Sequence, residues 1–83
     1  MILRSIKELA LFAISRRKQL GLTQSQVAEK VGLKQKTISA FENKPESTML
    51  ETAFVILSAL QIELDAAPQG QKSGKASGWK EEW

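Results

Sequence analysis

The chain has 83 residues, enough for one small domain whose single core gains stability from an added element or a partner chain. Apolar residues make up 42% of the sequence and charged residues 25%, which is typical of a folded globular protein. Cysteine and histidine are both missing, so disulfides, the usual zinc sites, Ser-His triads and Cys-His pairs are excluded. We therefore expect no metal, no cofactor and no enzyme activity.

The net charge is only +3, but the charges are unevenly distributed along the chain. Residues 16–44 hold seven basic side chains and two acidic ones, whereas residues 45–66 hold four acidic side chains and no basic one. An electropositive surface of this kind suits a phosphate backbone, and an ordinary solvated surface is the alternative. No run approaches the roughly 20 apolar residues that span a bilayer, and residues 1–8 carry charge too early for a secretory signal. We expect a soluble cytoplasmic protein that makes no membrane contact.

Three helix starts are indicated by a hydroxyl residue that is followed three positions later by Glu or Gln. In such a capping box the hydroxyl accepts from a free backbone amide, and the Glu or Gln side chain accepts from the amide of the cap residue. The hydroxyl residues are Ser5, Thr23 and Thr48. With the apolar spacing, they predict four helices, over residues 6–20, 24–31, 35–43 and 49–60.

Helix ends and the core follow from glycine, proline and apolar spacing. Gly21 and Gly32 are expected to end the first two helices, since glycine adopts a left-handed backbone without strain. Pro45 breaks the chain after the third helix, because proline disfavours a helical residue before it. The side chains expected to face the core are Ile6, Leu9, Ala10, Ala13, Ile14, Val27, Ala28, Val31, Ile38, Phe41, Leu50, Ala53, Phe54 and Leu57.

After the fourth predicted helix, the apolar period changes from that of a helix to that of a strand. Leu60, Ile62, Leu64 and Ala66 alternate with polar residues. A lone strand leaves its backbone groups unpaired, and the sequence shows no second strand. The simplest partner is the same segment of a second copy, which would make Ile62, Leu64 and Ala66 the dimer strand of a two-fold homodimer. A continuation of the fourth helix is the alternative.

The composition changes again after residue 66. Residues 67–83 are rich in glycine, serine and lysine, as expected for a linker or a disordered tail. We therefore expect a folded domain over residues 1–66 and a flexible tail over residues 67–83. The large apolar residues of this tail are Trp79 and Trp83. A terminal tryptophan is either an anchor for a partner protein or a side chain that folds back on its own domain.

Residues 23–43 form a pattern of two short helices joined by a tight turn. Gly32 allows the turn, and Ala28 allows the two helices to approach closely. Ile38 and Phe41 are expected to hold the second helix against the rest of the domain. The opposite face of that helix is left exposed, from residue 34 to residue 39.

The exposed face has the side chains that read DNA. Lysine donates to guanine O6 and N7, and glutamine binds adenine N6 and N7 with both of its amide atoms. A helix start also favours phosphate through its free amides. The predicted base contacts are Lys34, Gln35, Lys36 and Ser39. The predicted contacts to the DNA backbone are Gln24, Ser25, Thr37, Asn43 and Lys44.

The segment LGLTQSQVAEKVGLKQKTISAFEN resembles the Cro/repressor-type helix-turn-helix family, and the likeness extends over residues 17–60. This resemblance implies an all-α fold of about four helices, with one short C-terminal strand that pairs across a homodimer. It also implies double-stranded operator DNA as the ligand. Arg17 and Glu42 match positions that pair with each other in this family, so we interpret them as scaffold and not as DNA contacts.

Residues 21–66 and the Glu82-Trp83 end are similar, more narrowly, to the HipB-type antitoxins. That family implies a dimeric repressor of its own operon that holds a HipA-type serine/threonine kinase toxin, with Trp83 as the toxin-binding residue. Lys36 departs from the family pattern, in which a small residue is expected, so the preferred operator sequence is expected to differ. The family's DNA contacts match Gln24, Ser25, Lys34, Gln35 and Ser39.

The leading hypothesis is therefore a repressor and antitoxin that is cytoplasmic and associated with the nucleoid. A stand-alone or phage-like repressor without a toxin is the first alternative. A protein-interaction module that does not bind DNA is the second. An enzyme is the least supported reading, because the sequence shows no carboxylate cluster and no glycine-rich phosphate loop.

Overall fold

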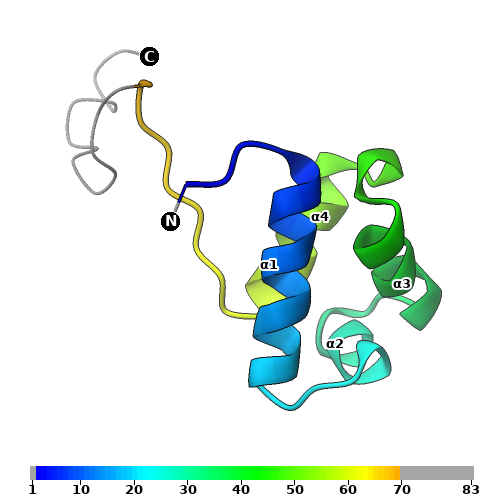
Figure 1. Cartoon of the computed structure of the whole chain (residues 1–83). Helices are drawn as coiled ribbons and strands as arrows, with labels where there is room; N and C mark the ends of the chain where they lie inside the picture. Colours follow the sequence, from blue (N-terminus) through cyan, green and yellow to red (C-terminus); the bar gives the residue numbers. More distant parts are fainter. Residues whose placement is uncertain (1, 70–83) are drawn as a thin grey trace.

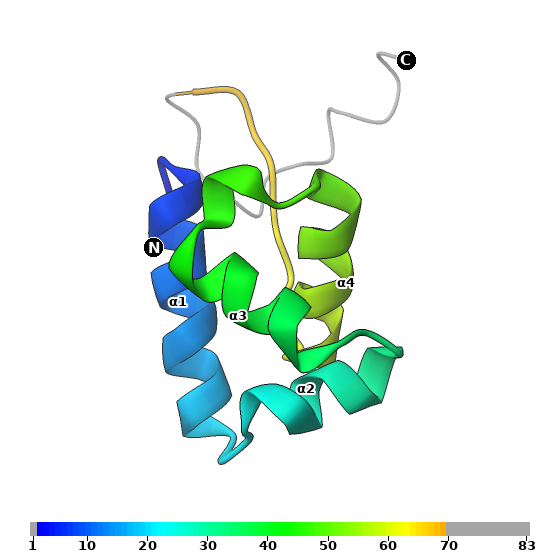
Figure 2. The same cartoon turned by 90° about the vertical axis from the view of Figure 1, so that its right-hand side faces the viewer.

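The computed structural model describes residues 2–69 as a small all-helical domain. Its elements are α1 (Ile6–Gln19), α2 (Gln24–Val31), α3 (Gln35–Asn43), the short 3-10 helix η1 (Pro45–Ser47) and α4 (Leu50–Ala59). The four predicted helices are confirmed, and α2 and α3 have the predicted bounds. Figure 2 shows α3 between α1 and α4, with α2 below them. No helix within residues 2–69 is long and apolar enough to cross a membrane.

The predicted capping box is complete at α2. The Thr23 hydroxyl accepts from the Gln26 amide at 3.1 Å, and the Gln26 side chain accepts from the Thr23 amide at 2.8 Å. At α1, Ser5 accepts from the Glu8 amide at 3.1 Å, but the Glu8 carboxylate accepts from the Arg4 amide and not from Ser5. Local sequence therefore determines where both helices begin.

The prediction of Thr48 as the cap of α4 is wrong. Helix α4 begins at Leu50 after Met49, whose side chain makes no cap hydrogen bond. The amide of Thr48 donates to the Pro45 carbonyl at 3.0 Å and thereby closes the turn of η1. Because proline starts a tight turn there, Thr48 belongs to that turn and the helix starts two residues later.

The core is formed by one buried cluster to which all four helices contribute. It comprises Leu9, Ala10, Ala13, Val27, Ala28, Ile38, Phe41, Ala53, Ile56, Leu57 and Leu60. Leu50 and Phe54 were expected in this core, but they are 67% and 50% exposed. Helix α4 is apolar on nearly every side, so spacing alone did not identify its inward stripe. Ile6, Ile14 and Val31 are half-buried, and Ile6 packs against the core.

Helix α4 ends at a left-handed residue, which excludes its continuation into residues 62–66. Gln61 has a φ of 58°. The Ile62 amide donates to the Leu57 carbonyl at 3.0 Å, and the Gln61 amide donates to the Ser58 carbonyl at 3.1 Å. These two bonds form a Schellman motif, in which glycine is the usual left-handed residue.

Replacing Gln61 by glycine should stabilise the domain by about 0.5–1 kcal/mol, because glycine removes the steric cost of the left-handed backbone. Urea unfolding at fixed protein concentration measures this change. Ser15→Gly, at an exposed position inside α1, is the control and should destabilise by a similar amount. Equal losses in both variants would contradict the argument.

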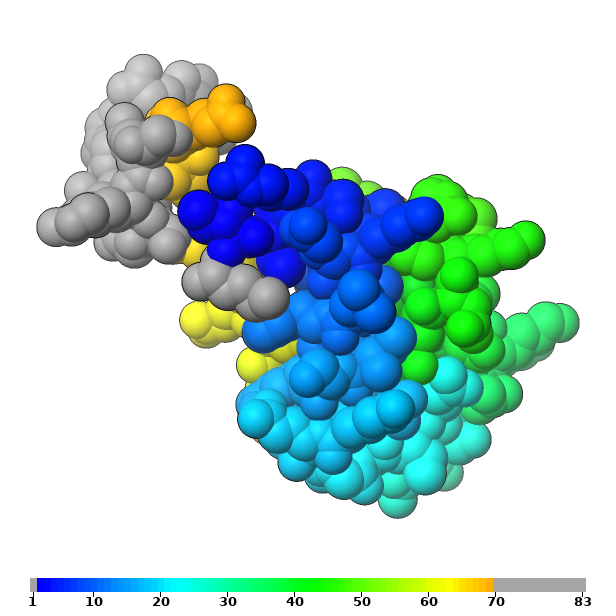
Figure 3. Space-filling model, viewed as in Figure 1, coloured from blue at the N-terminus to red at the C-terminus, as the bar shows by residue number. Residues whose placement is uncertain are grey.

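The segment after α4 leads away from the helices. Ile62 packs partly against the core, whereas Leu64 is 47% exposed. Residues 62–68 have no regular secondary structure in the single chain. Figures 1 and 3 place this segment on the side of the molecule opposite α3. Pairing with a second copy stays a prediction, because its partner strand belongs to another chain.

Candidate nucleic-acid interface

The turn between α2 and α3 is built as the sequence predicted. Gly32 is left-handed, with a φ of 71°, and the Leu33 amide donates to the Ala28 carbonyl at 2.9 Å. Ala28 is buried where the two helices meet, and Ile38 and Phe41 are fully buried on the inner side of α3. Helix α3 is therefore held rigidly from its inner side, which leaves its outer side available to a ligand.

The start of α3 is exposed and carries positive charge. Lys34 is the cap residue and makes no side-chain cap hydrogen bond, and Gln35 and Lys36 follow it as exposed residues. The first turn holds no acidic residue. Helix dipole and lysine charge thus act in the same direction, so this end of α3 favours an anionic ligand.

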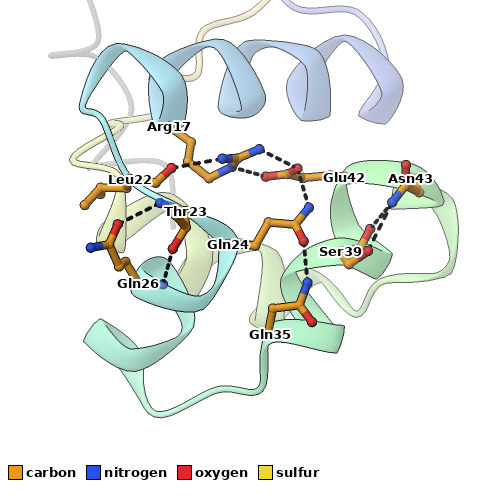
Figure 4. A network of polar contacts seen from close by, with 9 residues as sticks. All are labelled: Arg17, Leu22, Thr23, Gln24, Gln26, Gln35, Ser39, Glu42 and Asn43. Carbon is orange, nitrogen blue, oxygen red and sulfur yellow. Dashed lines mark hydrogen bonds and ion pairs between the residues drawn. The ribbon is translucent and has the colours of Figure 1, made fainter.

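A largely buried ion pair connects α1 to the end of α3 (Figure 4). Arg17 Nε donates to Glu42 Oε2 at 2.7 Å, and Arg17 Nη2 donates to Glu42 Oε1 at 3.1 Å. Their side chains are 13% and 7% exposed. Arg17 also donates to the Leu22 carbonyl at 2.9 Å, next to the start of α2. The expected pair of Arg17 and Glu42 is confirmed. It is bidentate, with one N–H···O hydrogen bond to each carboxylate oxygen, which is a strong arrangement for an arginine–carboxylate contact.

The ion pair continues into the predicted DNA contacts, a connection that sequence reasoning missed. Gln24 Nε2 donates to Glu42 Oε1 at 2.8 Å, and Gln35 Nε2 donates to Gln24 Oε1 at 2.5 Å (Figure 4). A carboxylate only accepts, so the orientation of the Gln24 amide is determined, and that of Gln35 follows. Among residues 2–69, Gln35 has no partner for its oxygen and for one N–H, which are the two groups that a glutamine uses on adenine.

A second polar contact lies one turn further along α3. Asn43 Nδ2 donates to the Ser39 carbonyl oxygen at 2.9 Å and to the Ser39 hydroxyl oxygen at 3.2 Å. Ser39 follows Gln35 by four positions, so both lie on the same face of the helix.

Three more predicted site residues lie on α2, on α3 and just after α3. Ser25 is exposed in the first turn of α2, Lys44 is exposed just after α3, and Thr37 is half-buried. Figures 1 and 2 show α3 on one side of the molecule and residues 62–69 on the other, so the predicted dimer strand is separate from the DNA contacts. Trp83 lies outside the described residues.

A family model described as Helix-turn-helix matches residues 14–66, more than half of the chain. The protein therefore belongs to this helix-turn-helix family, which is a family of DNA-binding proteins and not of enzymes.

Within that family, Antitoxin HipB of Escherichia coli O6:H1 is 44% identical over 61 residues, which are 74% of this chain and 65% of the relative. The aligned part of the chain thus spans just under two thirds of that curated relative. Two solved structures, a HipA-HipB-O2-O3 complex and a HipB-O4 20mer complex, contain chains that are each 40% identical. Both match with a TM-score of 0.79, over 83% of this chain and 97% of the other. The expected likeness to HipB-type antitoxins is confirmed.

Proposed function

We propose that the protein is a dimeric transcriptional repressor and the antitoxin of a type II toxin-antitoxin system. It represses its own operon and neutralises a HipA-type serine/threonine kinase toxin. The main supporting observation is the exposed, positively charged start of α3, which is held from behind by Ile38 and Phe41 and connected at Gln35 to a buried ion pair. The chain is also similar to HipB chains in two solved structures, a HipA-HipB-O2-O3 complex and a HipB-O4 20mer complex. This likeness supports the same function.

Each dimer places two copies of α3 in successive major grooves, about 34 Å apart on one face of the duplex. Gln35 binds an adenine, while Lys34 and Lys36 donate to guanine or to nearby acceptors. Helix α2 approaches the phosphates through Ser25. Bound dimers occupy promoter DNA and thereby repress transcription, which places the protein on the nucleoid in the cytoplasm.

The dimer is proposed to form on the side away from α3. Residues 62–66 lie there, so pairing of these segments between two copies leaves both α3 helices uncovered (Figure 2). Leu64 would then be covered by the second copy. Leu50 and Phe54 present further exposed apolar surface on α4, which suits contact with a second protein chain.

One preparation of the full-length protein tests all parts of this proposal. Light scattering should give the mass of a dimer. The dimer should shift a duplex from its own promoter, with an affinity that falls steeply as the salt concentration rises. The same dimer should co-purify with a HipA-type kinase encoded beside it. A monomer, or a chain that shifts no duplex, would contradict the repressor.

The two tryptophans of the tail give a matched pair of variants for the kinase contact. Trp83→Ala should weaken capture of the kinase by about 30-fold, as expected for an aromatic anchor at an interface, and should leave the DNA shift unchanged. Trp79→Ala is the control and should leave both unchanged. If Trp83→Ala does not weaken capture, Trp83 is not the toxin-binding residue, and if no kinase is captured at all, a repressor without a toxin is the better description.

A further inference from the structure

The contact between Asn43 and Ser39 has a determined direction (Figure 4). The Ser39 carbonyl oxygen only accepts hydrogen bonds, so the atom that faces it at 2.9 Å is the Asn43 nitrogen and not the Asn43 oxygen. The same nitrogen lies 3.2 Å from the Ser39 hydroxyl oxygen. The amide nitrogen of Asn43 is therefore directed into α3, and the hydroxyl oxygen of Ser39 is an acceptor in this contact.

The hydroxyl hydrogen of Ser39 is consequently left for another molecule. A serine in or near a helix commonly donates back to a carbonyl of the preceding turn. Ser58 does so to the Val55 carbonyl at 2.8 Å, and Ser47 does so to the Lys44 carbonyl at 2.9 Å. Within the described part of the chain, the structure gives Ser39 no such acceptor. Its hydroxyl oxygen accepts from Asn43, which leaves its hydrogen available for an acceptor of a bound ligand.

We infer that Asn43 is a positioning residue that makes Ser39 a hydrogen-bond donor to a base edge. This inference rests on the proposed operator binding. A donor selects a base with an acceptor in the major groove, namely guanine O6 or N7, adenine N7 or thymine O4, and it disfavours the amino group of cytosine. Asn43 then acts on sequence preference through Ser39 instead of holding a phosphate, because its amide nitrogen is already engaged by Ser39.

The test compares full-length variants on duplexes that carry each of the four bases at every position of one operator half-site. Asn43→Ala frees the hydroxyl of Ser39 to accept as well as donate, so preference at one base pair should relax by about threefold to tenfold. Asn43→Asp would place a carboxylate oxygen against the Ser39 carbonyl oxygen, which only accepts, so the contact should be lost and the preference should relax as in Asn43→Ala. The added negative charge lowers affinity for every duplex, so the measured quantity is the ratio between duplexes.

Two controls separate this role from a phosphate contact. In a Ser39→Ala background, Asn43→Ala should cause no further change in base preference. Lys44→Ala, at the next position, should lower affinity for all duplexes alike and make the salt dependence shallower.

The inference is wrong if Asn43→Ala, like Lys44→Ala, lowers affinity for all duplexes alike. It is also wrong if Ser39→Ala leaves base preference unchanged. If the unmodified chain shows no sequence preference, the proposed function fails first and this inference fails with it.

Discussion

Replacing Lys34 and Gln35 together by alanine should weaken operator binding at least about 30-fold, because each of the two base contacts contributes about 1–3 kcal/mol. Both side chains are exposed at the start of α3 and neither contributes to the core. The free energy of unfolding should therefore stay within about 0.5 kcal/mol of the unmodified protein. Fluorescence anisotropy with a labelled promoter duplex measures the affinity.

The control for this pair is a variant with the same loss of charge elsewhere. Lys7 and Gln69 are both exposed, and the segment of residues 62–69 lies on the side away from α3 (Figure 1). Lys7→Ala with Gln69→Ala should change operator affinity only a few-fold, through the lost charge. If the Lys34 and Gln35 pair behaves in the same way, α3 is not the recognition helix.

Glu42→Ala should destabilise the domain by about 1.5–3 kcal/mol, because it leaves the largely buried Arg17 guanidinium without the carboxylate that accepts two of its hydrogen bonds. A domain of this size has a total stability of about 4–12 kcal/mol, so the loss is a large share of it. Urea unfolding at fixed protein concentration measures the change. Arg17→Met combined with Glu42→Leu removes both charges and keeps the volume, so it should be far less destabilised than the single variant.

The combined variant also separates the stability of the fold from the order of the site. Without Glu42, Gln24 loses the acceptor that holds it at 2.8 Å, and Gln35 loses its determined orientation. The double variant should therefore fold but bind the operator about tenfold more weakly, as expected when a contact residue is no longer held in position. Unchanged affinity would mean that the ion pair serves only the fold.

The sequence by itself determined the parts of the protein whose signals are local. The bounds of α2 and α3 follow from the Thr23 capping box, the left-handed Gly32 and the proline after α3, and each acts within one or two turns. The exposed face of α3 followed as well, because the inward positions of Ile38 and Phe41 identify the opposite, outward side of the same helix. Signals from residues close together in the sequence were therefore enough to locate the candidate interface on α3.

Only the tertiary structure decided the features that depend on contacts between distant segments. The inward stripe of α4 uses Ile56 and Leu57 and leaves Phe54 exposed, because the packing of other helices selects one side of a helix that is apolar on nearly all sides. The chain of contacts from Glu42 through Gln24 to Gln35 joins residues 18 and 11 positions apart. Such pairings are set by where the helices cross, and a crossing is a property of the assembled core and not of any one segment.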